Sequence, residues 1–413
     1  MNYSNKIIFA FGSVPKDGGT FTFYRNLRPP LLEYGIDMRC VAVGKEQAEL
    51  WEEAYADEGC VLLAPGTRDV KKQAMAFAEW CEQERTDVVT GINSEAILSS
   101  LPHLPERIRV MSRCASAFDH GYRITLSCAG RLSRIVATTP RLERGLINDY
   151  GADASRLRLI PNGIAPEPFE AAASSPRGHE TLLRLGFLSR LHSYKGVFHL
   201  PQIVRELNRM GIAFRLRIAG KGKHRSIIER EMRSEVGRKQ VEFIGAILPK
   251  QVPSFLAETD VFLFTSHFEG CPNVLLEAIM AGCVPVSWLI EGITDFIIED
   301  GKTGFISTMG DCREFAQKIA ILSNNRDLLQ SMSTAASRAG RERFSHRTSA
   351  AAYAKLIEEV MSEPPPRWIP KPWSEFQGDP NFMHTWKERL PIRFRSRLKE
   401  LFLRLSHVSK TTG

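Results

Sequence analysis

Two glutamates flank the start of a predicted helix in the second half of the chain. Glu269 lies in the loop after a strand predicted at Val261 to Thr265, and Glu277 lies about one turn inside a helix predicted at Val274 to Ala281. Where a parallel strand ends and a helix opens, unpaired backbone N–H groups bind anions and sugar hydroxyls. Both carboxylates are therefore candidate acceptors for ligand hydroxyls. The alternative is a pair of surface glutamates that the helix dipole favours.

The residues that join the two glutamates are candidate ligand contacts through their backbone. They are Gly270, Cys271, Pro272, Asn273 and Val274. Proline suits the first turn of a helix, because its missing N–H would have been unpaired there anyway.

Two cations follow another predicted strand, Leu183 to Ser189. Arg190 and Lys195 are five positions apart at the end of that strand. They could hold a diphosphate, arginine through its planar fork and lysine as a point charge. The alternative is an exposed basic turn. Gly220 and Gly245 follow the next two strands and would let a ligand approach the backbone at the same sheet edge.

The elements that must position these residues alternate between β-rich apolar runs and helical patterns, which predicts an α/β fold with parallel sheets covered on both faces. Strands in the first half are predicted at 6–11, 38–43, 87–92, 109–112 and 134–138, and in the second half at 183–189, 214–219, 241–244, 261–265 and 284–288. Helices are predicted at 20–34, 70–84, 201–210, 224–236, 250–258, 274–281, 310–324, 327–343 and 348–361. Asn162-Gly163 is a turn signal.

The predicted organisation has five parts. Residues 1–165 form one domain, 166–180 a linker, 181–345 a second domain, 346–362 a helix that crosses back, and 363–413 a Pro/Trp-rich connector with a basic tail. With 413 residues, the chain is long enough for two or three domains at roughly 150 residues each.

Composition excludes several classes of protein. The chain is 43% hydrophobic and 25% charged, as in soluble globular proteins. Its longest apolar stretch, Ala278 to Ile290, is shorter than the roughly 20 residues that span a bilayer. The apolar run near Met1 is too short for a secretory signal, so a cytoplasmic protein is expected. The eight cysteines contain no C-x-x-C pair, which disfavours a zinc site or a disulfide framework.

The positive charge is concentrated at the C-terminus. The whole chain carries +8, and residues 364–413 hold ten Lys/Arg against four Asp/Glu. The main body is close to neutral, which argues against nucleic-acid binding. The apolar residues between Pro391 and Ser409 follow the spacing of one helical face, so this segment is predicted to be an amphipathic basic helix. It would dock on an anionic membrane surface, or else pack against the protein itself.

The order of these motifs resembles the retaining GT-B-fold glycosyltransferases of family 4, also called glycosyl transferases group 1. The most specific part is Glu269-x7-Glu277 with Gly270, Pro272 and Ala278. The supporting motifs are Gly18-Gly19, Ile160 to Ile164, Arg190 with Lys195-Gly196, Gly220-Lys221-Gly222 and Asp300 to Phe305.

The resemblance implies two Rossmann-like α/β/α domains that face a central cleft, with the donor on the second domain and the acceptor on the first. Arg190 and Lys195 would hold the donor diphosphate, Glu277 the ribose, and Glu269 with residues 270–274 the transferred sugar. The Gly18-Gly19 loop would close on the diphosphate from across the cleft. The substrates would be a nucleotide diphosphate sugar and a glycan or lipid-linked acceptor in polysaccharide biosynthesis.

One absence and one departure from the family pattern bear on this reading. No Asp-x-Asp sequence is present to hold a metal-bound diphosphate, so no metal or other cofactor is expected and cations and helix N-termini must neutralise the charge. Family members usually carry a histidine after the fourth or fifth strand of the first domain. Arg113 or Cys114 occupies that place here, and His120 comes several residues later.

Two other functions remain open from the sequence. A GT-B nucleotide-sugar epimerase would use the same donor pocket but would need acid/base carboxylates in the first domain. A non-catalytic scaffold would explain the missing histidine, although the intact Glu269/Glu277 and Arg190/Lys195 pairs argue against it.

Overall fold

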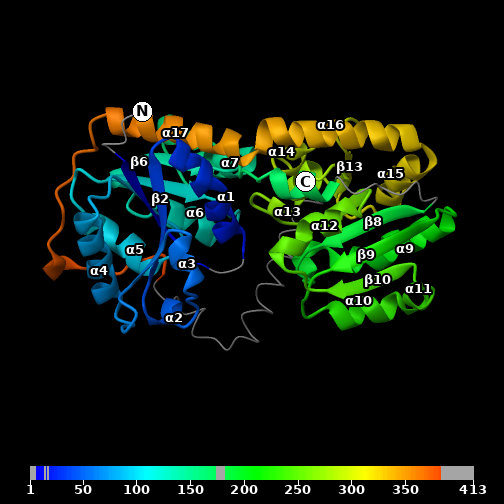
Figure 1. Ribbon diagram of the computed structural model, residues 1–413, viewed down its shortest axis with the longest axis horizontal. Coiled ribbons are helices and arrows are strands. Elements are labelled where there is room, and N and C mark those ends of the chain that lie inside the picture. Colours follow the sequence, from blue (N-terminus) through cyan, green and yellow to red (C-terminus); the bar gives the residue numbers. More distant parts are fainter. Residues whose placement is uncertain (1–5, 14, 16–17, 174–181, 383–413) are drawn as a thin grey trace.

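The structure, a computed structural model, describes residues 6–13, 15, 18–173 and 182–382. Two α/β domains lie side by side, each built on one sheet with helices on both faces (Figure 1). All the strand pairs in both sheets are parallel. This confirms the predicted α/β fold with two Rossmann-like domains.

The N-terminal domain contains a seven-stranded sheet in the order β3-β2-β1-β4-β5-β6-β7. Its strands are β1 (Ile7–Gly12), β2 (Ile36–Val43), β3 (Cys60–Leu63), β4 (Val88–Gly91), β5 (Arg109–Cys114), β6 (Leu132–Ala137) and β7 (Leu157–Leu159). Its helices are α1 (Gly19–Glu33), α2 (Lys45–Ala48), α3 (Ala54–Asp57), α4 (Val70–Gln83), α5 (Glu95–Ser100), α6 (Asp119–Thr125) and α7 (Pro140–Asn148).

The C-terminal domain contains a six-stranded sheet in the order β10-β9-β8-β11-β12-β13. Its strands are β8 (Leu183–Leu188), β9 (Phe214–Ala219), β10 (Val241–Gly245), β11 (Val261–Phe264), β12 (Val284–Trp288) and β13 (Phe305–Ser307). Its helices are α8 (Glu167–Ala173), α9 (Leu200–Arg209), α10 (Arg225–Glu231), α11 (Arg233–Gly237), α12 (Val252–Ala257), α13 (Asn273–Met280), α14 (Thr294–Ile297), α15 (Cys312–Asn324) and α16 (Arg326–Phe344). The last helix, α17 (His346–Ser362), returns to the N-terminal domain.

Strands missing from the sequence prediction, such as β3 and β13, have only four and three residues, too few for a periodic pattern to show. The helix predicted at 224–236 is divided into α10 and α11. Met232 ends α10 and buries its side chain in the core. The predicted linker begins with α8, which packs against α12.

Two chain crossings connect the domains and lie side by side. The N–H of Ile164 donates to Phe344 O at 2.9 Å, and the N–H of His346 donates to Ile164 O at 2.9 Å. A Cβ on Gly163 would come within 2.6 Å of His346 Cα. Residues 161–163 form neither a turn nor a bend, so the turn predicted at Asn162-Gly163 is wrong. Glycine is needed there because the second crossing packs against its Cα.

After α17 the chain runs as a strap along the N-terminal domain. We call residues 363–382 the strap. Trp368 Nε1 donates to Pro102 O at 3.1 Å, and the ring of Trp373 stacks on His103 with centroids 4.3 Å apart. Phe382, the last described residue of the strap, packs against the N-terminal domain. The basic tail predicted to form a helix at 391–409 lies outside the described residues, and its contact with a membrane stays a prediction. In the part of the chain that is described, no helix is both long and apolar enough to cross a membrane.

Candidate active site

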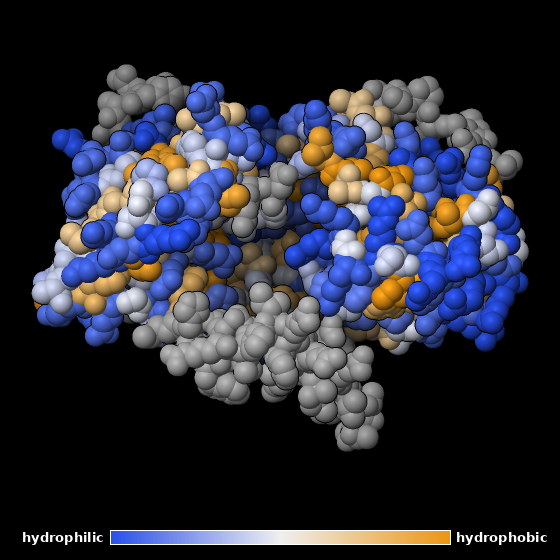
Figure 2. Space-filling view, turned by 90° about the horizontal axis from the view of Figure 1, so that it is seen from below, coloured by the Kyte–Doolittle hydropathy of each residue, from blue (hydrophilic) through white to orange (hydrophobic). Residues whose placement is uncertain are grey.

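The carboxyl edges of both sheets face the cleft between the domains. Seen from below, the two lobes are separated by a hollow (Figure 2). The loops that follow β8, β9 and β11 meet there, together with the loop before α1. This arrangement follows from parallel pairing, which places the carboxyl ends of neighbouring strands at one edge.

One cavity in the cleft has a volume of about 370 Å³ and matches the predicted donor site. Predicted residues that line it are Gly18, Gly19, Arg190, Lys195, Gly220, Asn273, Val274 and Glu277. Sequence reasoning missed the apolar side of the cavity, which includes Leu188, Ile247 and Val252. Nothing in the local sequence of these three distinguishes them from ordinary core residues.

A second cavity of about 290 Å³ adjoins the first and shares Gly19, Lys195, Asn273 and Val274 with it. It adds the predicted residues Glu269, Cys271 and Pro272. The N-terminal domain contributes Arg113, Ala115 and Thr20, and the crossing segment contributes Asn162. The two cavities together form one composite pocket with Lys195 at their junction.

Lys195 and Glu269 form an ion pair at this junction. Lys195 Nζ lies 2.5 Å from Glu269 Oε1, and the two side chains are only 14% and 10% exposed. Three backbone contacts bring their loops together. Thr265 Oγ1 donates to Lys195 O at 2.9 Å, the N–H of His267 donates to Tyr194 O at 2.9 Å, and a Cβ on Gly196 would lie 1.8 Å from Thr265 O. The pair is therefore held by the backbone and not only by its own charges.

Arg190 differs from Lys195 in being exposed. Its guanidinium lies 5.5 Å from the centre of the Tyr194 ring and forms no ion pair with any described residue. A cation without an internal partner at the mouth of the cavity is available to a ligand anion.

Glu277 projects from α13 and lines the first cavity. Burial raises the pKa of Glu277 to about 7, and no hydrogen bond to it is found within the described residues. A carboxyl group that is buried without a donor lacks the hydrogen bonds that would stabilise its charge. A ligand hydroxyl that donates a hydrogen bond to the Glu277 carboxylate would stabilise its charged form and so lower that pKa.

Two predicted contacts have a structural role instead. Gly245 lines neither cavity, and its carbonyl accepts the N–H of Gly220 at 2.6 Å. Gly270 also lines neither cavity, because it packs against the other domain. Its carbonyl accepts Thr139 Oγ1 at 3.2 Å, and a Cβ on it would lie 2.1 Å from Ala115 O. Neighbouring backbone fills the space beside Gly270, and the contact of either glycine with a ligand stays a prediction.

Of the three candidates for the missing histidine, the structure places Arg113 in the cleft. Cys114 is buried, and burial raises the pKa of its thiol. His120 is exposed on α6, where its ring meets Phe382 edge-on with centroids 5.5 Å apart. Only Arg113 among them lines a cleft cavity.

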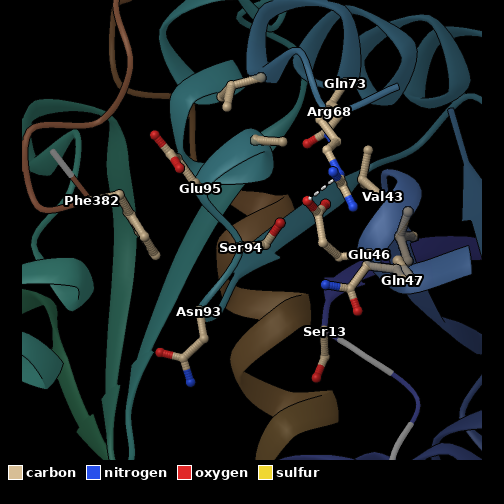
Figure 3. A pocket seen from close by; sticks show the side chains of 14 residues that line it. Ser13, Val43, Glu46, Gln47, Arg68, Gln73, Asn93, Ser94, Glu95 and Phe382 are labelled. Atoms are coloured by element: carbon tan, nitrogen blue, oxygen red, sulfur yellow. Dashed lines mark ion pairs between the residues drawn. The ribbon is translucent and has the colours of Figure 1, made fainter. Parts of the chain in front are cut away.

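A third cavity of about 360 Å³ lies in the N-terminal domain at the carboxyl ends of β1, β2 and β4. Its lining is rich in hydroxyl, amide and carboxyl groups (Figure 3). Arg68 Nε and Glu46 Oε1 form an ion pair at 3.1 Å on one side, and Phe382 from the strap lies on the opposite side. Sequence reasoning did not find this site, because no local motif marks it.

The C-terminal half matches a known family. Residues 173–339 match the family model described as glycosyl transferases group 1. Residues 173–339 therefore resemble a group 1 glycosyl transferase domain. The putative colanic acid biosynthesis glycosyltransferase WcaL of Escherichia coli K12 is 32% identical over 205 residues, which are 47% of this chain and 45% of that protein. The chain thus spans about half the length of this relative.

Solved structures extend the likeness to the whole fold. A glycosyltransferase from Rickettsia africae superposes with a TM-score of 0.72 at 13% identity over 87% of this chain and 100% of that one. The complex of Anabaena Alr3699/HepE with UDP-glucose gives 0.68 at 16% identity over 86% and 100%. The fold that surrounds the group 1 domain is therefore GT-B.

Proposed function

We propose that the protein transfers a sugar from a nucleotide diphosphate sugar to a glycan or lipid-linked acceptor in polysaccharide biosynthesis, with retention at the anomeric carbon. The observation that carries this proposal is the Lys195–Glu269 pair at the junction of two cleft cavities. One cavity has Arg190 and Glu277 for a nucleotide diphosphate, and the other has Glu269 for the attached sugar.

In this scheme the bond from the sugar C1 to the diphosphate oxygen breaks while the acceptor oxygen bonds to C1. The nucleoside diphosphate leaves with the bonding electrons, and its leaving oxygen takes up the proton that the acceptor hydroxyl loses. Arg190 and Lys195 offset the negative charge that grows on the leaving group, as preorganised cations do in a pocket with little water. Glu269 orients the sugar through its hydroxyls and stays paired with Lys195, whose ammonium lies at the junction with the diphosphate cavity. Proteins related by fold hold UDP-glucose, so UDP-sugars are the first donors to test.

The decisive experiment is a screen of nucleotide sugars with the full chain, in which released nucleoside diphosphate and new glycoside are both measured. Transfer with the donor's anomeric configuration, read by NMR, supports the proposal. Conversion of the donor sugar to an isomer without transfer would indicate the epimerase instead. If no nucleotide of any base binds, the protein would be better explained as a non-catalytic scaffold.

Glu277→Gln is expected to weaken the affinity for free UDP by about tenfold or more, because a charge-assisted acceptor of ribose hydroxyls is lost. Glu269→Gln, the matched carboxyl variant, should affect UDP much less. Because the Glu277 pKa is about 7, its charged form prevails only above that pH. The wild-type advantage over Glu277→Gln should thus grow from pH 6 to pH 8. Calorimetry checks both points, and a larger loss from Glu269→Gln would reverse the assigned roles.

Activity is expected to persist in excess EDTA. The chain has cations at the diphosphate position, and no group of three or more His, Cys, Asp or Glu suited to a metal occurs among the described residues. Inactivation by EDTA that Mg²⁺ reverses would show that the diphosphate needs a divalent ion.

The acceptor is proposed to occupy the N-terminal cavity beside Phe382. A sugar ring placed on an aromatic face there would bury apolar C–H surface, while its hydroxyls meet the polar lining. Phe382→Ala should raise the acceptor KM about tenfold and leave donor hydrolysis without acceptor unchanged. Phe376→Ala is the control, since Phe376 stacks near His103 in the same strap but does not line this cavity. An equal rise in both variants would mean that only the position of the strap matters.

A further inference from the structure

Arg113 is a buried cation that faces the second cleft cavity without a carboxylate partner. It stands at the end of β5 and is only 6% exposed. Its Nη2 donates to Asn162 Oδ1, its guanidinium carbon lies 3.9 Å from the centre of the Phe23 ring, and its Nε has no hydrogen-bond partner. No ion pair to Arg113 occurs within the residues that the structure describes. A buried charge without a counter-ion is unfavourable, so its retention needs a reason.

Two other buried arginines of the same domain show what a structural role looks like. Arg109, on the same strand, donates to the carbonyls of Val360 and Glu363 at 3.1 and 2.8 Å. Arg131 donates to three backbone carbonyls. Both use several donors to brace a loop or helix end, and neither lines a cleft cavity. Arg113 instead donates to a side-chain amide, Asn162 Oδ1, and lines a cleft cavity.

The position of Arg113 is held by a chain of amides that crosses the cleft. Asn162 Nδ2 donates to Asn273 Oδ1 at 2.6 Å, and Asn273 Nδ2 donates to Gly19 O at 3.4 Å. This chain links the end of β5 to the starts of α13 and α1. Asn162 accepts from Arg113 but carries no charge, so it orients the guanidinium without neutralising it.

The charged residues that line the second cavity indicate which charge a ligand would supply there. Lys195 and Glu269 neutralise each other there, and Arg113 is the remaining charged residue in the lining. The diphosphate is placed in the adjoining cavity, which Arg190 lines and Arg113 does not. The missing anion therefore belongs to the part of the substrate that occupies the second cavity, which is the sugar.

We propose that the second cavity binds a sugar that carries a carboxylate, as in a uronic acid, and that Arg113 pairs with this carboxylate. The planar fork of arginine matches a carboxylate through two parallel hydrogen bonds. This inference rests on the proposed function and deepens it by naming the class of sugar. The carboxylated sugar is either the transferred one or the acceptor residue that meets it.

The test compares acidic and neutral sugars on the wild type and on Arg113→Gln. The donor arm measures the affinities for UDP-glucuronic acid and UDP-glucose, and for GDP-mannuronic acid and GDP-mannose. The acceptor arm measures how glucuronate and glucose inhibit donor hydrolysis. We expect the wild type to prefer the acidic member at least tenfold in one arm, and Arg113→Gln to abolish that preference. The arm in which the preference appears identifies the sugar that bears the carboxylate.

Three controls separate recognition from folding. Arg113→Lys keeps the charge but loses the fork, and should retain part of the preference. Arg109→Gln removes a buried arginine from the same strand, and should lower the melting temperature without changing the preference. Free UDP should bind Arg113→Gln as it binds the wild type, which also shows that this variant is folded.

The proposal is overturned if the wild type shows no preference in either arm while it binds nucleotide normally. It is also overturned if Arg113→Gln weakens free UDP as much as the acidic sugar, because Arg113 would then serve the diphosphate. If no nucleotide binds at all, the proposed function fails together with this inference. These results are distinguishable, since UDP binding is measured independently of the sugar.

Discussion

Lys195→Ala is expected to lower kcat/KM by at least about a hundredfold. The Lys195 ammonium stands at the junction of the two cavities and is only 14% exposed. A cation about 4 Å from the charge that forms on the leaving group stabilises it by up to roughly 4 kcal/mol at an effective dielectric near 20. Because about 1.4 kcal/mol corresponds to a tenfold change in rate, even a part of that interaction gives the expected loss.

Arg190→Ala should also impair turnover, but less than Lys195→Ala. Arg190 is exposed, so water and salt screen its charge more strongly. The loss of kcat/KM caused by Arg190→Ala should therefore shrink as ionic strength rises, whereas the loss caused by Lys195→Ala should not.

Lys302→Ala provides the control for both cation variants. Lys302 belongs to an exposed Gly-Lys-Thr sequence and pairs with Glu299 at 2.9 Å on the surface. Its removal should leave kcat/KM within about twofold, as for most isolated surface ion pairs. Steady-state kinetics with a fixed acceptor measures all three variants. Wild-type turnover in both Lys195→Ala and Arg190→Ala would remove the proposed diphosphate site.

Gly270→Ala is expected to abolish most transfer while leaving nucleotide binding intact. A Cβ on Gly270 would lie 2.1 Å from the carbonyl oxygen of Ala115 in the other domain. The atom that the new Cβ would meet is a backbone carbonyl oxygen, which cannot swing aside as a side chain can, so relief requires the domains to move apart at the cleft. A displacement of about 1 Å between reacting groups can cost on the order of a hundredfold in rate. The variant should thus lose kcat with acceptor but retain the UDP affinity of the C-terminal domain.

Gly237→Ala is the matched control, because a Cβ on Gly237 meets nothing within 4 Å. It should be neutral in both assays. Kinetics together with calorimetry of UDP binding checks the prediction. A loss of UDP affinity in Gly270→Ala as large as the loss of kcat would instead indicate local damage to the 269–274 loop.

The strand–helix alternation and the donor motifs were predictable from the sequence, because both depend on neighbouring residues. Apolar runs long enough to form β8, β9 and β11 mark their own strands. The rule that parallel strands end at one edge then brings Arg190, Gly220 and Glu277 toward a common cavity, as the structure has it. The short strands β3 and β13 were missed.

Contacts between distant residues were decided only by the tertiary structure. The Lys195–Glu269 pair joins positions 74 apart, and only the packed loops show that the two charges neutralise each other. The choice of Arg113 over Cys114 and His120 depends on which way the end of β5 and the start of α6 face the cleft.

By itself, the sequence determined the α/β class and the set of residues able to bind a diphosphate and a sugar, since residue type and local spacing specify strands, loops and their chemistry. Only the tertiary structure decided that Gly245 and Gly270 lie outside the lining of the two cleft cavities, that Phe382 reaches the N-terminal cavity, and that Arg113 faces the cleft without a counter-ion. The physical reason is that close approach, burial and charge balance depend on atoms brought together from both domains. No local pattern in a chain records which distant atoms those will be.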